Sequence, residues 1–126
     1  MKECKYLKNR IIVQKYGGTS IGDVEKLKLI AKKISETKEK GFFPVIVVSA
    51  MGKTTDDLVS MSKKVTFLNK APDLREKDIL LSTGELVSST LLAISIKSLD
   101  QKVISLSGSQ AGIITDDIHG SARISD

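Results

Sequence analysis

Cysteine, proline and aromatic residues are scarce in this sequence, and tryptophan is absent. The 126 residues include one cysteine, two prolines and 4% aromatic side chains. The single cysteine, Cys4, excludes a disulfide within the chain, and its charged N-terminal setting suggests an incidental thiol. No apolar run approaches the length of a membrane span, and the N-terminus has no apolar core of signal-peptide length. A cytoplasmic protein without a membrane partner is therefore expected.

Positive charge is concentrated in the first third of the chain. Residues 1–40 contain eleven Lys or Arg and five Asp or Glu, a net charge of +6, whereas the remaining 86 residues contain nine and ten, a net charge of −1. A basic segment is typical of nucleic-acid binding, but few aromatic side chains are available here for stacking on bases. Most of these lysines also alternate with glutamates on one expected helix. We expect a solvated helix face and no nucleic-acid partner; strongly salt-dependent DNA binding would reverse that view.

The first half of the sequence predicts a strand, a helix and a second strand. Residues 11–13 and 42–48 are apolar, β-branched runs, and Gly41 is a natural end for the helix between them. The second run is apolar at every position, which favours a strand covered on both faces, as in a parallel sheet. The helix starting near Gly22 carries apolar residues at steps of three and four. They are Val24, Leu27, Ile30, Ala31 and Ile34.

A glycine turn after the first strand predicts an anion site. Lys15 lies near the end of that strand, and Gly17 and Gly18 follow it. Ser20 and Asp23 fit a Ser-x-x-Asp capping box, which would begin the next helix. A strand, a glycine turn and a helix N-terminus direct backbone N–H groups towards a phosphate, with a cation beside them. The same residues also fit an ordinary tight turn, because they lack the spacing of a dinucleotide-binding fingerprint.

The second half predicts two more helices and a third strand. Gly52-Lys53-Thr54 resembles the end of a P-loop, but Val47 occupies the position where that motif requires its first glycine. Asp56 and Asp57 instead suit the first turn of a helix that continues to about Val65. A longer helix is expected over residues 74–98, with Gly84 either interrupting it or marking a close approach by backbone or ligand. The third strand is expected at residues 103–106.

Five segments of the chain, taken in order, resemble aspartokinase. They are Val-Gln-Lys-Tyr-Gly-Gly-Thr-Ser (13–20), Val-Val-Ser-Ala-Met-Gly-Lys-Thr-Thr-Asp (47–56), Leu-Leu-Ser-Thr-Gly-Glu (80–85), Gly-Ser-Gln-Ala-Gly-Ile (108–113) and His-Gly-Ser-Ala-Arg-Ile (119–124). The resemblance covers nearly everything from Ile11 onward. It implies an α/β protein of the amino-acid-kinase fold: a three-layer α/β/α sandwich with a mainly parallel sheet.

The resemblance also implies a reaction, the transfer of the γ-phosphoryl group of ATP to the side-chain carboxylate of L-aspartate with Mg²⁺. The product, 4-phospho-L-aspartate, begins lysine, threonine and methionine synthesis. The family pattern assigns ATP and phosphate binding to Lys15, Tyr16, Gly17, Gly18 and Ser49, with Lys15 also catalytic. It assigns aspartate binding to Thr55 and Glu85. Read alone, Thr55 fits a helix N-cap and Glu85 an exposed helix residue. His119 and Arg123 are expected to be structural, and no metal ligands are assigned.

The resemblance implies that residues 1–126 are the N-terminal portion of a kinase domain, without its C-terminal half or the ACT domains that sense end products. Half of a parallel sheet should leave an unpaired edge and exposed apolar surface. We therefore expect a homo-oligomer, and little kinase activity from the chain alone. A catalytically inactive fragment or an interaction module that retains the fold is the alternative function.

Overall fold

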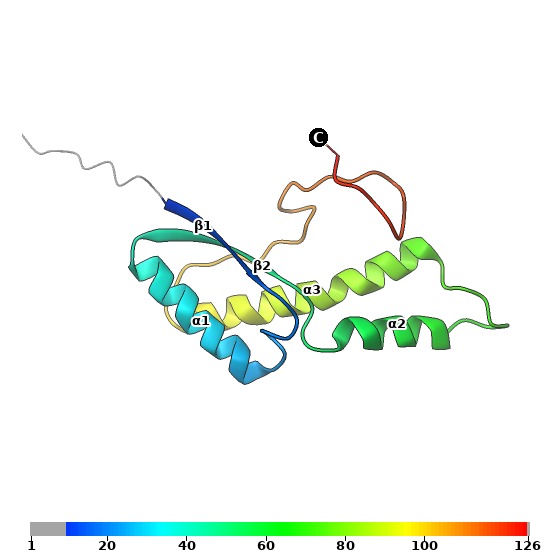
Figure 1. The fold of residues 1–126 in the computed structure, drawn as a ribbon, viewed down its shortest axis with the longest axis horizontal. Helices are drawn as coiled ribbons and strands as arrows, with labels where there is room; N and C mark the ends of the chain where they lie inside the picture. Colours follow the sequence, from blue (N-terminus) through cyan, green and yellow to red (C-terminus); the bar gives the residue numbers. More distant parts are fainter. Residues whose placement is uncertain (1–9, 126) are drawn as a thin grey trace, which may run out of the picture.

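The computed structural model describes residues 10–125, so the expectation for Cys4 lies outside the described part. Its elements are strand β1 (Arg10–Tyr16), helix α1 (Val24–Glu39), strand β2 (Phe42–Val48), helix α2 (Thr54–Lys64) and helix α3 (Leu74–Lys97). The two strands pair in parallel, with Ile11 opposite Phe43 and Tyr16 opposite Val48. This order of elements confirms the predicted βαβ unit and the α/β class with parallel strands (Figure 1).

Helices α1 and α3 pack on one face of the sheet and form the core with it. Both helices contact β2 and each other, and the fully or nearly buried apolar side chains come mainly from them. These core residues are Ile21, Leu27, Ile30, Ala31, Ile34, Leu92 and Ile96. The predicted apolar stripe of α1 is thus confirmed, except that Val24 at its first turn is 57% exposed.

The other face of the sheet is bare among the described residues, contrary to the expectation that β2 is covered on both faces. Burial alternates along both strands, because α1 and α3 supply only one covering layer. Of the three layers expected, the described residues therefore provide two. The exposed apolar side chains on the bare face are Ile11, Val13, Phe43, Val45 and Val47.

Helix α1 begins later than the predicted capping box. Asp23 is itself the N-cap residue, and its carboxylate accepts a hydrogen bond of 2.8 Å from the backbone N–H of Lys26, which lowers the pKa of Asp23. Ser20 belongs to the preceding turn, where its N–H donates to the carbonyl of Gly17. The helix ends at Glu39 with Lys40 as its C-cap, and Gly41 follows with a φ of +85°, the left-handed conformation that glycine adopts most easily.

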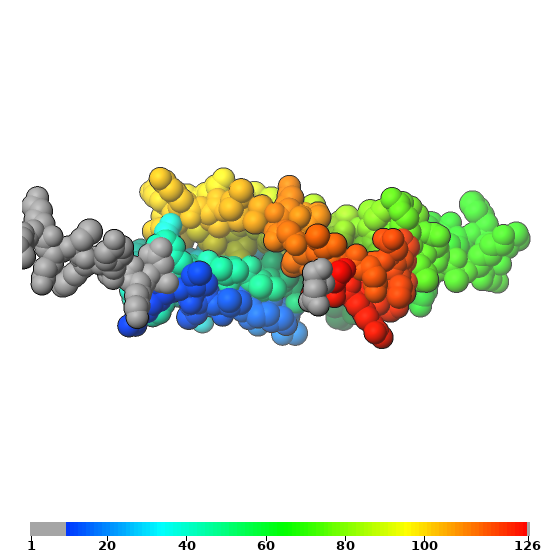
Figure 2. Space-filling model, turned by 90° about the horizontal axis from the view of Figure 1, so that it is seen from above, coloured from blue at the N-terminus to red at the C-terminus, as the bar shows by residue number. Residues whose placement is uncertain are grey.

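Helix α3 is continuous through Gly84. It projects with α2 beyond the sheet at one end of the molecule (Figure 2). By length and composition alone it could cross a membrane, which corrects the expectation that no segment would have that length. One such helix is weak evidence, because the core helix of a globular protein passes the same test. Its face towards α1, α2 and β2 carries the buried residues Gly84, Ser88, Leu92, Ala93 and Ile96.

The third predicted strand is not formed. Residues 103–106 are extended, but the structure pairs them with no strand in the described part of the chain. Beyond them, residues 115–124 fold back on themselves, with Thr115 bridged to Ile124. This returning segment contacts the beginning of α3, where the backbone N–H of Gly120 donates to Asp78 at 2.7 Å. His119 and Arg123 belong to this segment, and the Nδ1 atom of His119 lies 3.6 Å from the same carboxylate.

The close packing at Gly84 gives a stability test. A Cβ atom at Gly84 would lie 2.9 Å from the Cβ of Ala50, so Gly84→Ala must push α3 away from the turn after β2. Overpacking of this kind costs about 1–3 kcal/mol, and better helix propensity returns about 1 kcal/mol. We expect a lower urea midpoint and a net loss of about 1 kcal/mol of unfolding free energy.

Gly108→Ala is the matched control, because a Cβ at that position would meet no atom within 4 Å. Its unfolding free energy should stay within about 0.5 kcal/mol of the parent chain. A higher midpoint for Gly84→Ala would show that only helix propensity matters at this position.

Candidate functional site

The carboxyl ends of β1 and β2 meet at one edge of the sheet, where two turns cross at close range. The N–H of Ser49 donates to the carbonyl of Tyr16, and the N–H of Gly52 donates to the carbonyl of Gly18, both at 3.1 Å. A Cβ atom on Gly18 would lie only 2.8 Å from the carbonyl oxygen of Ala50. Gly18 is therefore required for the two turns to touch, backbone against backbone.

The turn after β1 leaves backbone donors free beside a lysine. Both Ser20 and Ile21 donate their N–H groups to the carbonyl of Gly17, which closes the turn. Within residues 10–125, the N–H groups of Gly17 and Gly18 have no protein partner. The Nζ atom of Lys15 lies 3.3 Å from the position that a Cβ on Gly17 would occupy, so the ammonium group lies over the glycine turn. Free N–H donors beside a cation are suited to binding an anion.

Helix α2 directs a second set of donors to the same edge. Lys53 is its N-cap residue and forms no capping hydrogen bond through its side chain. The N–H of Thr54 donates to the carbonyl of Met51, and the N–H of Asp57 donates to the carbonyl of Lys53. Those of Thr55 and Asp56 are the donors that remain in the first turn. Thr55 is exposed in this turn. The alternative expectation that Thr55 is the helix N-cap is wrong, because Lys53 occupies that position and the helix begins at Thr54.

Glu85 connects α3 to this edge. One oxygen of its carboxylate, Oε1, accepts a hydrogen bond of 3.2 Å from the N–H of Ala50, in the turn after β2. The preceding residue, Gly84, allows this approach, since a Cβ there would also lie 3.4 Å from the Cγ2 atom of Thr54. Gly84 thus marks a close approach, but the neighbouring atoms belong to side chains, among them those of Ala50 and Thr54, rather than to the backbone or ligand that the sequence predicts. Glu85 is exposed, and its second oxygen forms no hydrogen bond or ion pair within residues 10–125, which leaves that oxygen available to a ligand.

Tyr16 differs from the other predicted site residues. Its ring packs against the core, its hydroxyl donates to Oε1 of Gln14 at 3.3 Å, and burial raises its pKa. Only its backbone reaches the edge of the sheet, through the carbonyl that accepts from Ser49. The half-buried Ser49 lies at that edge, as predicted.

The structure thus gathers Lys15, Gly17, Gly18, Ser49, Thr55 and Glu85 around the two crossing turns. The N–H of Ala50 and the free donors of α2 were not predicted. Backbone N–H groups are common to nearly all residue types, so the sequence does not single them out; only the small residues Ser49, Ala50 and Gly52 indicated a close approach in this turn.

Two grooves described on this chain lie elsewhere. One follows β2 and residues 101–104, and the other lies between α1 and α3; neither contains a predicted site residue. Among residues 10–125, no three His, Cys, Asp or Glu side chains are grouped closely enough to hold a metal ion. The candidate site, at the carboxyl edge of the sheet, therefore lies outside both of these grooves.

The carboxylate of Glu85 gives a test of this geometry. Glu85→Ala would leave the N–H of the buried Ala50 without a partner, whereas Glu85→Gln keeps an oxygen acceptor of the same length. We expect the alanine variant to lose about 1–3 kcal/mol of unfolding free energy and the glutamine variant less than about 1 kcal/mol. Urea unfolding with amide exchange at Ala50 would measure both, and equal losses would argue against the hydrogen bond.

Comparison with known proteins identifies a family. Residues 10–125 match the model of the amino acid kinase family. The chain is 52% identical over 114 residues to an aspartokinase of Geobacillus stearothermophilus, covering 90% of this chain and 27% of that protein. It is 48% identical over 116 residues to aspartokinase 2 of Bacillus subtilis, covering 92% of this chain and 28% of that protein.

Comparison with solved structures also finds an aspartate kinase. The aspartate kinase from Synechocystis matches 76% of this chain and 16% of its own, with a TM-score of 0.70 and 48% sequence identity. The chain thus spans about a quarter of the length of the curated relatives that it matches.

Proposed function

Because the chain belongs to the amino acid kinase family, we propose that residues 10–125 form the phosphoryl-transfer end of an aspartate kinase site. The convergence of Lys15, the glycine turn and Glu85 at the carboxyl edge of the sheet carries this proposal. Open α/β sheets bind their ligands at that edge. The aspartokinase names of the relatives supply the substrates, ATP and L-aspartate. Residues 1–126 are then the N-terminal portion of a catalytic domain, in a cytoplasmic enzyme.

The proposed reaction joins two anions, so the site must reduce their repulsion and align them. A side-chain carboxylate oxygen of aspartate bonds to the γ-phosphorus of ATP, and the bond from that phosphorus to the bridging oxygen breaks. ADP leaves, and 4-phospho-L-aspartate is formed. This acyl phosphate would enter lysine, threonine and methionine synthesis.

Each predicted residue has a role that its position allows. Lys15 and the free N–H groups of Gly17 and Gly18 would hold the transferring phosphoryl group, with the hydroxyl of Ser49 close by. Tyr16 would contribute through its backbone alone, because its side chain is packed in the core.

The acceptor would be bound from the helix side of the edge. Thr55 lies in the first turn of α2, where its hydroxyl and the free N–H groups suit a substrate carboxylate. The accessible oxygen of Glu85 would pair with the α-ammonium group, which separates an amino acid from a plain diacid. Mg²⁺ would enter with ATP, bound to its phosphates and to water, as is usual for this ion in kinase sites.

A chimera tests the function in a complete enzyme. This chain would replace the matching segment of the Geobacillus stearothermophilus aspartokinase, to which it is 52% identical. Acyl phosphate formed from ATP and L-aspartate would be trapped as the hydroxamate. We expect Lys15→Ala to lower kcat by about 10²–10³-fold, the usual effect of removing one preorganised charge-stabilising group. Glu85→Gln should instead mainly raise the KM for aspartate.

Lys32→Ala is the control, because Lys32 is exposed on α1 and lines the groove between α1 and α3. Its turnover should equal that of the parent chimera. A Lys15→Ala chimera that melts normally and turns over at the parent rate would refute the proposed role. The chain alone should yield no hydroxamate, because it spans only about a quarter of the length of the aspartokinases that it matches.

The bare sheet face favours a second candidate, an association module. Five large apolar side chains, Ile11, Val13, Phe43, Val45 and Val47, are each about half exposed or more. Such a surface favours self-association, so we expect the isolated chain to sediment as a dimer or larger species at micromolar concentration. Val13→Lys with Val45→Lys should shift it towards monomer, with Lys15→Ala as the unshifted control. A clean monomer for the unaltered chain would exclude this role.

A further inference from the structure

Two ammonium groups lie against the turn that follows β1. The Nζ atom of Lys15 lies 3.3 Å from the Cβ position of Gly17, at the start of the turn. The Nζ atom of Lys26, in the first turn of α1, donates to the carbonyl of Thr19 at 3.4 Å and lies 3.8 Å from the Cβ position of Gly22. Lys26 therefore lies over the far end of the same turn.

The far end of this turn borders the crossing with the turn after β2. The carbonyl oxygen of Gly18 lies 3.5 Å from the Cβ position of Gly22, and it accepts the hydrogen bond from Gly52 that joins the two turns. The carbonyl oxygen of Gly22 lies 3.3 Å from the Cβ position of Gly52. The positive charge of Lys26 is thus next to the junction around which the candidate site is built.

Lys26 occupies a position where a lysine does not favour the helix. Asp23 is the N-cap of α1, so Lys26 is the third helical residue, where Glu or Gln would complete a capping box. The positive end of the helix dipole also disfavours a cation there. Two contacts offset this cost, the long hydrogen bond to Thr19 and an ion pair of 3.6 Å with Asp23 in which both side chains are 54% exposed. Exposed pairs of this kind contribute little, so helix stability does not explain Lys26.

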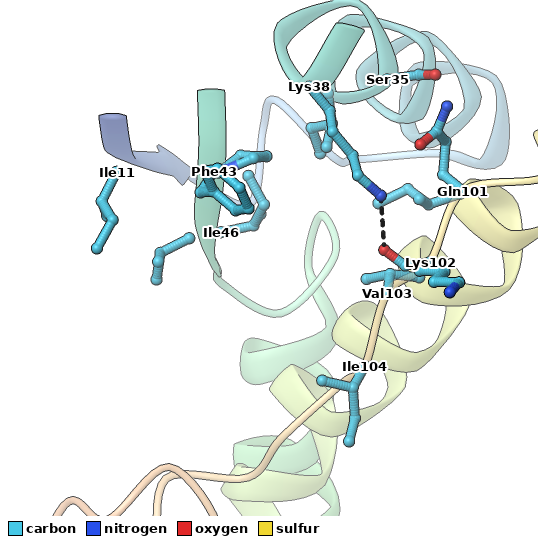
Figure 3. A pocket seen from close by; sticks show the side chains of 13 residues that line it. Ile11, Ser35, Lys38, Phe43, Ile46, Gln101, Lys102, Val103 and Ile104 are labelled. Atoms are coloured by element: carbon cyan, nitrogen blue, oxygen red, sulfur yellow. Dashed lines mark hydrogen bonds between the residues drawn. The ribbon is translucent and has the colours of Figure 1, made fainter. Parts of the chain in front are cut away.

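The other end of α1 shows a lysine in a position that stability does favour. Lys38 lies in the last turn, beside the negative end of the helix dipole. Its Nζ donates to the carbonyl of Lys102 at 3.2 Å and so connects α1 to the segment that follows α3 (Figure 3). Lys38 therefore has a structural role, which the position of Lys26 does not suggest for that residue.

We propose that Lys26 is a second phosphate-binding cation, which holds a non-transferring phosphate of ATP while Lys15 holds the transferring phosphoryl group. This inference rests on the proposed function. Lys15 lies beside the free N–H groups of Gly17 and Gly18, and Lys26 lies beyond Thr19, so a chain of phosphates along the turn meets both charges. Without nucleotide, the carboxylate of Asp23 pairs with Lys26, and the more highly charged phosphates compete with it for the ammonium group.

Lys26→Gln in the chimera tests this role. A contact with a non-transferring phosphate is the same in the ground state and in the transition state, so its loss raises KM and spares kcat. We expect the KM for ATP to rise about tenfold, the usual effect of losing one hydrogen bond to a charged group. The kcat should stay within about twofold of the parent chimera, in contrast to Lys15→Ala.

Lys28→Gln is the matched control. Lys28 belongs to the same helix and pairs with Glu25 at 2.9 Å with the same spacing of three residues, but it lines the groove between α1 and α3. Its KM for ATP should equal that of the parent. A Lys26→Gln chimera with a normal kcat and an unchanged KM would overturn the role of Lys26 and leave the proposed function intact.

Urea unfolding of the isolated chain separates binding from structure. Lys26→Gln should raise the urea midpoint, because it completes the capping box and removes a cation from the positive end of α1. Lys38→Gln should lower the midpoint, because it removes the link to Lys102. A lower midpoint for Lys26→Gln together with an unchanged KM would show that Lys26 only stabilises the turn.

Sodium tripolyphosphate gives a readout that does not need turnover. Its binding to the isolated chain should shift the amide resonances of Gly17 and Gly18, with a dissociation constant about tenfold higher for Lys26→Gln and unchanged for Lys28→Gln. Equal affinities for Lys26→Gln and the parent chain would overturn the proposal. No binding by the parent chain, together with a chimera that forms no hydroxamate, would refute the proposed function as well.

Discussion

The backbone contact between the turns that follow β1 and β2 determines the arrangement of the site. Gly18 and the carbonyl of Ala50 approach so closely that no side chain fits between them. The Gly52–Gly18 hydrogen bond then fixes the second turn against the first, and α2 begins two residues later. Glu85 completes the junction by accepting the N–H of Ala50. One contact therefore positions residues from two strands and two helices, although they lie far apart in sequence.

The contact between the two turns both stabilises the fold and leaves backbone donors free to bind an anion. Close backbone packing uses the carbonyls of Tyr16, Gly17 and Gly18 as acceptors within the protein. It leaves the N–H groups of the glycine turn and of the α2 N-terminus directed outward. An edge that exposes donors and buries acceptors attracts anions, and Lys15 adds a full charge to the partial charges of the backbone.

The two-stranded sheet has apolar side chains and backbone groups that the described residues leave uncovered, and both point to a larger sheet. Alternating exposure in β1 and β2 leaves an apolar face without a helix, and the backbone groups along one edge of β2 lack a strand partner among residues 10–125. Both features belong to a two-stranded sheet whose strands have the apolar composition of an interior sheet. The match to about a quarter of each relative's length agrees with a portion of a larger α/β layer.

The sequence by itself determined the βαβ order, the long α3 helix and the family, because apolar periodicity and five ordered motifs are local signals. It also indicated Lys15, the two glycines and Glu85 as site residues through those motifs. Only the tertiary structure decided that Asp23 caps α1, that Tyr16 faces the core and that residues 103–106 stay unpaired. Asp23 caps α1 through a contact only three residues away, which local spacing could not distinguish from a helix start nearer Ser20. The positions of Tyr16 and of residues 103–106 depend on partners distant in sequence, which local spacing does not encode.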